Sequence, residues 1–347
     1  MAISGLMPKV TLREVAEHAG VHPATVSRAL NPETQGMLNS ETLARVLAAA
    51  RELNYQTNTI ARSLRTQRSL TVGVLIPDIM NPLFPSIVRG IEDTLDRADY
   101  TSLIAYTDGR VDRVDARLSR LRQRGVDGLI VATAQLRDPT LEELLAEGVA
   151  VVQINRRSTS KAIPSVTADA AGGMLAAIRH LAELGHERIA YAGAPLRVST
   201  GRARLDAFRR GMRAAGLEVV AERIEQTQSV SVGEGARAGR ELLARAPDLT
   251  AIVTANDLIA LGCYDAVAEA GRSCPDDVSV IGFNDMPFTD RFDPPLTSVH
   301  FDQYEMGASA AAMLLRRLSG ESSGAPRVEL ETTLVVRAST AAPPKQR

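Results

Sequence analysis

The sequence lacks the features of several large classes of protein. Its only two cysteines in 347 residues, Cys263 and Cys274, form neither a CxxC pair nor a disulfide framework, so we expect both to be buried, reduced and structural. No apolar run approaches the roughly 20 residues of a membrane span, and the first residues lack the basic start and apolar stretch of a signal peptide. The expected compartment is therefore the cytoplasm.

Motifs of the common enzyme classes are missing as well. The five histidines are scattered without the spacing of metal ligands. The sequence contains no Walker loop, GxSxG elbow or SxxK motif, and the glycines at 233, 235 and 239 have the wrong spacing for a dinucleotide-binding fingerprint. We therefore expect no enzymatic activity, no metal site and no cofactor.

Charge is distributed unevenly along the chain. The net charge is −1, but residues 1–68 carry eight basic and five acidic side chains, whereas the remainder carries 32 basic and 36 acidic ones. A basic segment on a mildly acidic body suits a polyanionic partner at one end, because neutralised phosphates supply much of the affinity for DNA. A chance fluctuation explains the same split equally well.

The amino-terminal segment has the pattern of three short helices. Thr11 and Glu14 form a capping box, apolar residues follow at helical spacing, and Gly20 supplies a left-handed stop. A second helix begins with Pro23 at its first position, and a third runs from about 40 to 53. A tight turn between the first two helices predicts a helix-turn-helix, although small helical trios also occur as packing modules.

The second of these helices has a surface suited to a major groove. Val26 lies on its apolar face, which leaves small residues and one long side chain, Arg28, on the opposite side. A guanidinium can reach guanine O6 and N7 in a bidentate contact, and the Ala24 methyl can contact thymine. Thr25 and Ser27 can add phosphate or base contacts. For Arg28 alone, a solvated helix charge is the plainer interpretation.

This segment resembles a known family. The run Val10–Asn31, VTLREVAEHAGVHPATVSRALN, followed by Ala49–Thr66, AARELNYQTNTIARSLRT, is similar to the head and hinge of the LacI/GalR family of bacterial repressors. In that family Asn-x-x-Ala-x-x-Leu forms a hinge helix that orders on operator DNA, and residues 58–65 carry it without a gap. The resemblance implies that Leu64 from each of two subunits inserts into the minor groove and kinks the duplex.

Motif and resemblance together define the candidate DNA contacts. Two positions depart from the family pattern, since His22 stands where serine commonly precedes the recognition helix and Leu43 stands where an arginine is usual. We expect His22 to be a poorer helix cap than serine and to meet a phosphate instead, and one backbone contact near Leu43 to be missing. The expected contacts are Thr11, His22, Pro23, Ala24, Thr25, Ser27, Arg28, Asn31, Tyr55, Asn58, Ala61, Arg62 and Leu64.

The rest of the chain alternates short β-branched runs with helical patterns, which is typical of βαβ units in parallel sheets covered on both faces. The resemblance continues here and implies the two-lobed, type I fold of periplasmic sugar-binding proteins, with the chain crossing between lobes near 165–169, 298–302 and 324–330. The expected strands are Thr71–Ile76, Ser102–Tyr106, Gly128–Ala132, Val149–Ile154, Arg188–Ala192, Ala251–Thr254 and Val278–Gly282.

The predicted architecture is α/β, an all-α helix-turn-helix DNA-binding head followed by a periplasmic-binding-protein-like effector domain with parallel sheets. We expect the head at 1–57, a hinge helix and linker at 58–69, and an effector-binding and dimerisation domain at 70–340. Lobe one should hold about 70–167 and 301–326, and lobe two about 168–300 and 327–340.

Such lobes close around a small ligand at the carboxyl ends of their strands. Arg204 matches the family arginine that clamps an effector, and a forked guanidinium suits a carboxylate or vicinal hydroxyls. Asn and Asp after a strand are also ordinary turn residues, so each polar candidate has a structural alternative. The candidate effector contacts are Asp78, Asn81, Phe84, Asn155, Arg204, Val230, Asn256 and Asn284.

Two asparagines bear on the chemistry of the ligand. Positions that match Asn155 and Asn284 are often aspartate in the sugar- and purine-binding members, and an amide accepts fewer hydrogen bonds from hydroxyls while it also donates. This chain therefore has fewer negative charges near Arg204 than those members, which favours a partly anionic ligand such as a sugar acid or sugar phosphate.

The expected function is sequence-specific transcription regulation by a repressor that is a homodimer or a higher oligomer. Its expected partners are double-stranded operator DNA and a carbohydrate-like effector, a sugar, sugar acid or sugar phosphate. Two alternatives come from other classes. The first is a stand-alone sugar-binding protein, which the head and the missing export signal disfavour. The second is an α/β enzyme with an attached helical regulator, but the sequence shows no set of catalytic residues that would support it.

Overall fold

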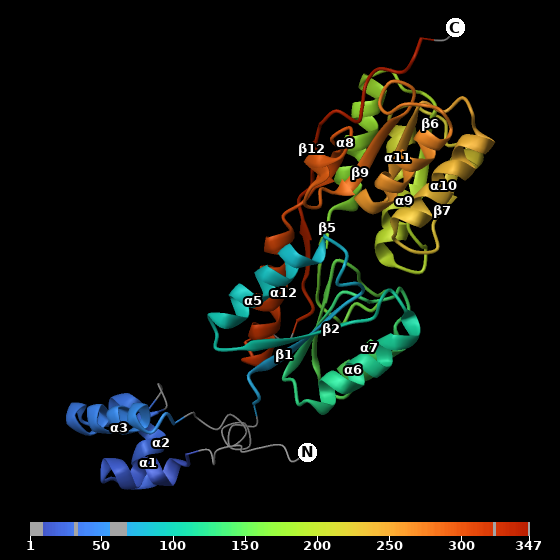
Figure 1. Cartoon of the computed structure of the whole chain (residues 1–347). Helices are drawn as coiled ribbons and strands as arrows, with labels where there is room; N and C mark the ends of the chain where they lie inside the picture. The colour runs from blue at the N-terminus through green and yellow to red at the C-terminus, as the bar shows by residue number, and fades with distance from the viewer. Residues whose placement is uncertain (1–9, 31–33, 56–67, 322–323, 346–347) are drawn as a thin grey trace, which may run out of the picture. The chain divides into compact units, whose positions relative to one another are not determined.

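The computed structural model describes residues 10–30, 34–55, 68–321 and 324–345. The chain forms two compact units, Met1–Ser69 and Leu70–Arg347, which we call the head and the body (Figure 1). The predicted α/β class with an all-α head is confirmed. Most of the predicted hinge segment, at 58–69, lies outside the described residues.

The described part of the head contains a helix-turn-helix. Its helices are α1 (Leu12–Ala19), α2 (Pro23–Ala29) and α3 (Ser40–Glu52). Thr11 Oγ1 accepts a hydrogen bond from the amide of Glu14 at 3.3 Å, and the Glu14 carboxylate accepts one from the amide of Thr11 at 2.6 Å, so the predicted capping box begins α1. Gly20 ends this helix at φ 62°, in the left-handed region that glycine enters without strain.

A small apolar core holds these helices together. Val15 of α1, Val26 of α2 and Val46 of α3 are fully buried. His18 Nε2 of α1 also lies 2.8 Å from Glu52 Oε2 of α3, but both of these side chains are largely exposed. Burial of apolar surface therefore contributes far more to the stability of the head than this pair does.

Lobe one of the body is a parallel sheet between two layers of helices. Its elements are β1 (Thr71–Ile76), α5 (Phe84–Asp96), β2 (Thr101–Tyr106), α6 (Val114–Gln123), β3 (Gly128–Val131), α7 (Pro139–Ala146), β4 (Ala150–Ile154), β5 (Ser165–Ala168), α12 (Gln303–Leu318) and β11 (Arg327–Leu330). The strand order is β11-β5-β4-β3-β1-β2, with every neighbouring pair parallel. Helices α5 and α12 cover one face and α6 and α7 the other (Figure 1), which explains why β3 is buried throughout.

Lobe two repeats this plan. Its elements are α8 (Ala170–Glu183), β6 (Ile189–Gly193), α9 (Ser199–Ala214), β7 (Ile224–Gln226), α10 (Val232–Arg245), β8 (Ala251–Thr254), α11 (Asp257–Glu269), β9 (Ser279–Asn284), β10 (Thr297–His300) and β12 (Thr333–Val335). The strand order is β12-β10-β9-β8-β6-β7, and only the pair of β10 with β12 is antiparallel. Helices α8 and α9 pack together, as do α10 and α11.

The described chain passes between the lobes at three places. The passages after β5 and after β10 agree with the predicted ones near 165–169 and 298–302. The third follows β11, at 331–332, whereas we predicted it at 324–330. Arg327 pairs with Ser165 of β5, so the assignment of 327–330 to lobe two is wrong. The short sequence RVEL alternates charged and apolar residues, which is typical of a half-buried strand, and we overlooked this signal in the sequence.

The two cysteines are free thiols, Cys263 buried and Cys274 half-buried, so the prediction of burial is right for Cys263 and wrong for Cys274. Within the described ranges, no helix has the length and apolar character needed to cross a membrane. The same residues contain no group of three or more His, Cys, Asp or Glu side chains arranged to hold a metal ion.

Candidate DNA-binding helix and effector cavity

Helix α2 presents the side chains that we expect to meet DNA. Arg28 and Ala24 are exposed, while Pro23, Thr25 and Ser27 are half-buried. Arg28 forms no ion pair with any described residue. Its guanidinium is thus available for a base edge or a phosphate.

His22 is the residue that precedes α2. Its Nδ1 accepts a hydrogen bond from the amide of Ala24 at 3.2 Å, so the ring caps α2 in place of the usual hydroxyl. One ring nitrogen of a neutral imidazole is an acceptor, and here it reaches the amide of the second helical residue. That this cap is poorer than serine stays a prediction.

The remaining predicted DNA contacts divide into two groups. Thr11 is engaged in its capping box, and Tyr55 is half-buried and packs against the core of the head. The other predicted contacts lie outside the described residues: Asn31, Asn58, Ala61, Arg62 and Leu64.

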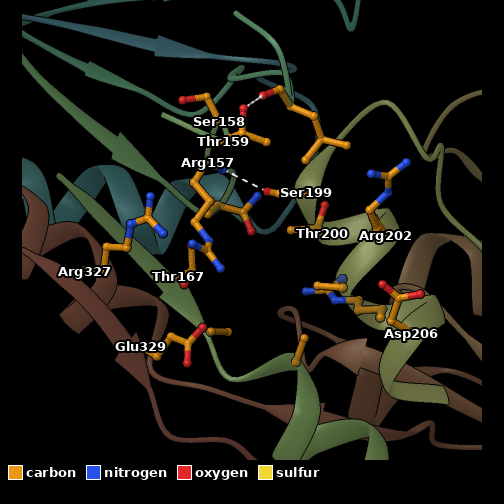
Figure 2. Close-up of a pocket in the computed structure, with 16 residues that line it drawn as sticks. Arg157, Ser158, Thr159, Thr167, Ser199, Thr200, Arg202, Asp206, Arg327 and Glu329 are labelled. Atoms are coloured by element: carbon orange, nitrogen blue, oxygen red, sulfur yellow. Dashed lines mark hydrogen bonds between the residues drawn. The ribbon is translucent and has the colours of Figure 1, made fainter. Parts of the chain in front are cut away.

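A cavity of about 380 Å³ lies between the lobes of the body. Lobe one contributes the loop after β4, the end of β5 and strand β11, whereas lobe two contributes mainly the first two turns of α9 (Figure 2). Two hydrogen bonds join the lobes nearby, from the Arg157 amide to Ser199 Oγ at 2.9 Å and from the Leu136 amide to the Arg197 carbonyl at 3.2 Å. The lining residues are Leu136, Asn155, Arg157, Ser158, Thr159, Thr167, Ala168, Ala170, Ser199, Thr200, Arg202, Ala203, Arg204, Asp206, Arg327 and Glu329.

Arg204 is the most constrained of the charged lining residues, with only 5% of its surface exposed. Its guanidinium carbon lies 3.7 Å from the centre of the Phe283 ring, Nη2 donates to Asn284 Oδ1 at 3.0 Å, and Nη1 donates to the Ala255 carbonyl. Its Nε is buried without a hydrogen-bond partner. Burial, above all, lowers the pKa of Arg204 to about 10, which leaves it charged at neutral pH.

Asn155 and Asn284 share an unusual backbone. Their φ angles are 61° and 112°, in the left-handed region that asparagine tolerates better than most residues with a Cβ. Asn155 lines the cavity directly, whereas Asn284 reaches it only through its bond to Arg204. Each asparagine therefore has a structural reason for its place in addition to the proposed role at the ligand.

The other predicted effector contacts do not line this cavity. Asp78 and Asn81 accept hydrogen bonds from the amides two residues ahead, which makes them turn residues. Asn256 caps α11 by accepting from the amide of Ile259. Phe84 is buried in the lobe-one core, and Val230 is half-buried beside lobe two. Contact of these residues with an effector stays a prediction.

The sequence reasoning missed most of the charged lining. Arg157 stands two residues after Asn155, and Arg202 and Asp206 flank Arg204 on α9, so position next to predicted contacts was an available signal. Arg327 and Glu329 alternate with Val328 and Leu330 along β11, so the strand had a signal that we did not use, but nothing local showed that it lies at the cavity.

Two family models match the chain. Residues 11–58 match the model of bacterial regulatory proteins of the lacI family, and residues 178–340 match the model of a periplasmic binding protein-like domain. The first match lies in the helix-turn-helix head, and the second lies within the body, which begins at Leu70. The resemblance that we described from the sequence is thereby confirmed.

Individual relatives agree with this assignment. The ribose operon repressor of Halalkalibacterium halodurans is 34% identical over 334 residues, which cover 95% of this chain and 97% of that protein. The solved transcriptional regulator CelR–cellobiose complex is 31% identical, with a TM-score of 0.74 over 95% of this chain and 100% of that one. The lac repressor dimer bound to operator and the anti-inducer ONPF is 27% identical, with a TM-score of 0.83 over 96% and 100%. This chain belongs to the LacI family of bacterial regulatory proteins.

Proposed function

We propose that the protein is a homodimeric repressor of the bacterial cytoplasm whose affinity for operator DNA is set by a carbohydrate in the cavity between its lobes. The observation that carries the proposal is the presence in one chain of a helix-turn-helix head and a polar cavity to which both lobes contribute. The relatives are named as regulators, which supports a regulator rather than an enzyme.

The head supplies the contact with DNA. Helix-turn-helix proteins place the amino-terminal end of the second helix against base edges in the major groove. In α2 that end carries exposed Ala24, and exposed Arg28 follows one turn later. The half-buried Thr25 and Ser27 lie between them. Arg28 reads a guanine, and the residues of the predicted hinge, Leu64 among them, contact the minor groove.

The cavity supplies the contact with the effector. A volume of about 380 Å³ lies within the range of small-molecule sites. Its lining combines hydroxyls from Ser199 and Thr200, the amide of Asn155 and several guanidinium groups, all of which bond to sugar oxygens. Relatives named for ribose and cellobiose support a carbohydrate as the ligand class.

The arrangement of the lobes couples binding of the effector to the affinity for DNA. Because residues of both lobes line the cavity, a ligand there stabilises one separation of the lobes over another. A ligand that binds two states differently changes their populations, and the reciprocal effect on DNA affinity is typically 5- to 150-fold.

A second copy of the chain binds at the edge of lobe one. Strand β2 is the last strand of its sheet and exposes three large apolar side chains, Leu103, Ile104 and Tyr106. Exposed apolar residues on an edge strand favour pairing with another chain. A dimer also matches the symmetry of paired half-sites in operator DNA.

The experiment that tests this proposal is a gel shift with the full chain and DNA selected from a random library. We expect one sequence to be enriched, the wild type to shift it, and one member of a panel of mono- and disaccharides to change the fraction shifted. Binding of all sequences with equal affinity, or no response to any carbohydrate derivative that binds the body, would contradict it.

A further inference from the structure

The cavity contains more positive charge than its own carboxylates offset. Four arginines line it, Arg157, Arg202, Arg204 and Arg327, against two acids, Asp206 and Glu329. In Figure 2 the side chains of Arg157, Arg202 and Arg327 surround one hollow, with Asp206 and Glu329 below them in this view. Within the described part of the chain, none of these arginines forms an ion pair with a carboxylate.

Two guanidinium groups, that of the cavity-lining Arg204 and that of the neighbouring, half-buried Arg156, are incompletely bonded. The Nε atoms of Arg204 and of Arg156, the residue that follows Asn155, are buried without a hydrogen-bond partner. Burial, with a smaller contribution from the positive charge of Arg197, lowers the pKa of Arg156 to about 10. The charge of Arg156 in turn acts against that of Arg204. The buried carboxyl of Asp257 acts on Arg204 in the opposite direction, but neither Arg204 nor Arg156 forms an ion pair with a described carboxylate. Burial of a charge without a directly paired counter-charge destabilises a protein.

The beginning of α9 adds a further preference for negative charge. This helix of 16 residues starts at Ser199, its N-cap is Val198, and no side chain caps its first amides. Uncapped amides and the helix dipole favour an anion at such an end. The hydroxyls of Ser199 and Thr200 line the cavity at the same end, about one turn before Arg204.

We propose that the effector carries an anionic group, a carboxylate or a phosphate on a sugar, held between the start of α9 and the arginines of lobe one. This inference rests on the proposed function and names the class of its ligand. Arg157 and Arg327 belong to lobe one, whereas Arg202 and Arg204 belong to α9 of lobe two. An anion between them attracts both lobes, and without it the like charges repel. The neutral amides of Asn155 and Asn284 leave that charge uncompensated until the ligand binds.

The test is calorimetry on the full chain with matched neutral and anionic sugars: ribose and ribose 5-phosphate, glucose, glucuronate and glucose 6-phosphate, with inorganic phosphate as the bare anion. We expect at least one anionic sugar to bind tenfold or more tightly than its neutral parent. Arg157→Gln and Arg327→Gln each lower that affinity about tenfold, and Arg210→Gln, an exposed position on the same helix α9, does not.

A second measurement needs no knowledge of the ligand. Without added anion, Arg157→Gln is expected to raise the Tm, because it removes repulsion. Arg327 also donates from Nη2 to the Ser160 carbonyl at 2.9 Å, so Arg327→Gln loses that bond as well, and Arg157→Gln is the variant that isolates the repulsion. Inorganic phosphate is expected to raise the Tm of the wild type more than that of either variant at equal ionic strength.

The outcomes separate this inference from the proposed function. Tighter binding of a neutral sugar that also changes operator binding would overturn the anionic ligand and leave the proposed function intact. Absence of binding by every anionic probe, or an equal phosphate effect in wild type and variants, also overturns the inference. Failure to bind any selected DNA would instead contradict the proposed function.

Discussion

Arg204 of α9 donates from Nη2 to Oδ1 of Asn284, the last residue of β9, across a distance of 3.0 Å. The same guanidinium lies over the Phe283 ring and bonds to the Ala255 carbonyl, so three groups hold a charged side chain that forms no ion pair with a described carboxylate. This bond joins a cavity-lining residue to the end of a buried strand. A substitution at Asn284 can therefore change the charge beside Arg204.

We therefore predict opposite effects for two substitutions at Asn284. Asn284→Ala removes a hydrogen bond to a charged group and lowers the free energy of unfolding by about 1.5–3 kcal/mol. Asn284→Asp supplies a counter-charge to Arg204, raises the stability relative to Asn284→Ala, and weakens binding of an anionic ligand. Chemical denaturation and calorimetry measure the two effects. Tighter anion binding by Asn284→Asp would contradict this account.

Arg28 on α2 is expected to recognise one base pair. Arg28→Ala should weaken binding to the selected site by about 1–3 kcal/mol and relax the preference at one position. Arg51→Ala, an exposed arginine in the last turn of α3, is the matched control for loss of one positive charge from the head. Fluorescence anisotropy on the selected site and on single-base variants measures both. Equal weakening on all sequences would mean that Arg28 contacts only phosphate.

The exposed apolar side chains of β2 are expected to form the dimer interface. Ile104→Asp places a charge where the second copy should pack, so the variant should sediment as a monomer at concentrations at which the wild type is a dimer. Val336→Asp, at an exposed apolar position after β12 in lobe two, is the control and should remain dimeric. An Ile104→Asp variant that stays dimeric would place the interface elsewhere.

His186 provides a prediction of pH dependence. Its ring is buried, with Nδ1 2.9 Å from Thr250 Oγ1 and Nε2 2.8 Å from the Ala341 carbonyl, and burial lowers its pKa below the ordinary value of 6.5. As the pH falls below 6.5, the His186 ring becomes protonated in the unfolded chain but stays neutral in the folded protein. The stability from this group is therefore complete above that pH and declines toward the lower folded pKa.

The measurement is an NMR titration of the His186 ring, together with denaturation at pH 7.5 and 5.5. We expect the ring to titrate below 6.5 and the free energy of unfolding to be smaller at pH 5.5. A ring pKa at or above 6.5 would contradict the assignment of the burial effect.

The head could be predicted from sequence almost completely, because its determinants are local. Thr11 and Glu14 define the start of α1, Gly20 its end, and Pro23 the start of α2, and each acts through backbone groups within a few residues. His22 shows where such rules fail. The usual ranking of capping residues favours hydroxyl, amide and carboxylate side chains, but here the Nδ1 atom of His22 accepts the capping hydrogen bond.

The central strands of the body could also be predicted, since β3 and β8 are apolar runs buried on both faces. The short strands β7 and β12 are only partly buried and form through pairing with distant strands, so their own residues carry little information. The four residues of β11 do alternate between charged and apolar, but they do not show which strand it pairs with. The lining of the cavity was therefore the least well predicted part of the body. Arg327 and Glu329 reach it only because β11 pairs with β5, a relationship over 160 residues of chain.

The central claim is that occupancy of the cavity controls the affinity of the head for DNA. It is tested most directly by anisotropy titration of the selected operator with wild type and Arg204→Gln, with and without the carbohydrate that calorimetry identifies. We predict that both proteins bind the free operator with similar Kd, and that the ligand changes the Kd of the wild type at least fivefold but not that of the variant. An operator Kd that the bound ligand leaves unchanged, or a full response in Arg204→Gln, would contradict the claim.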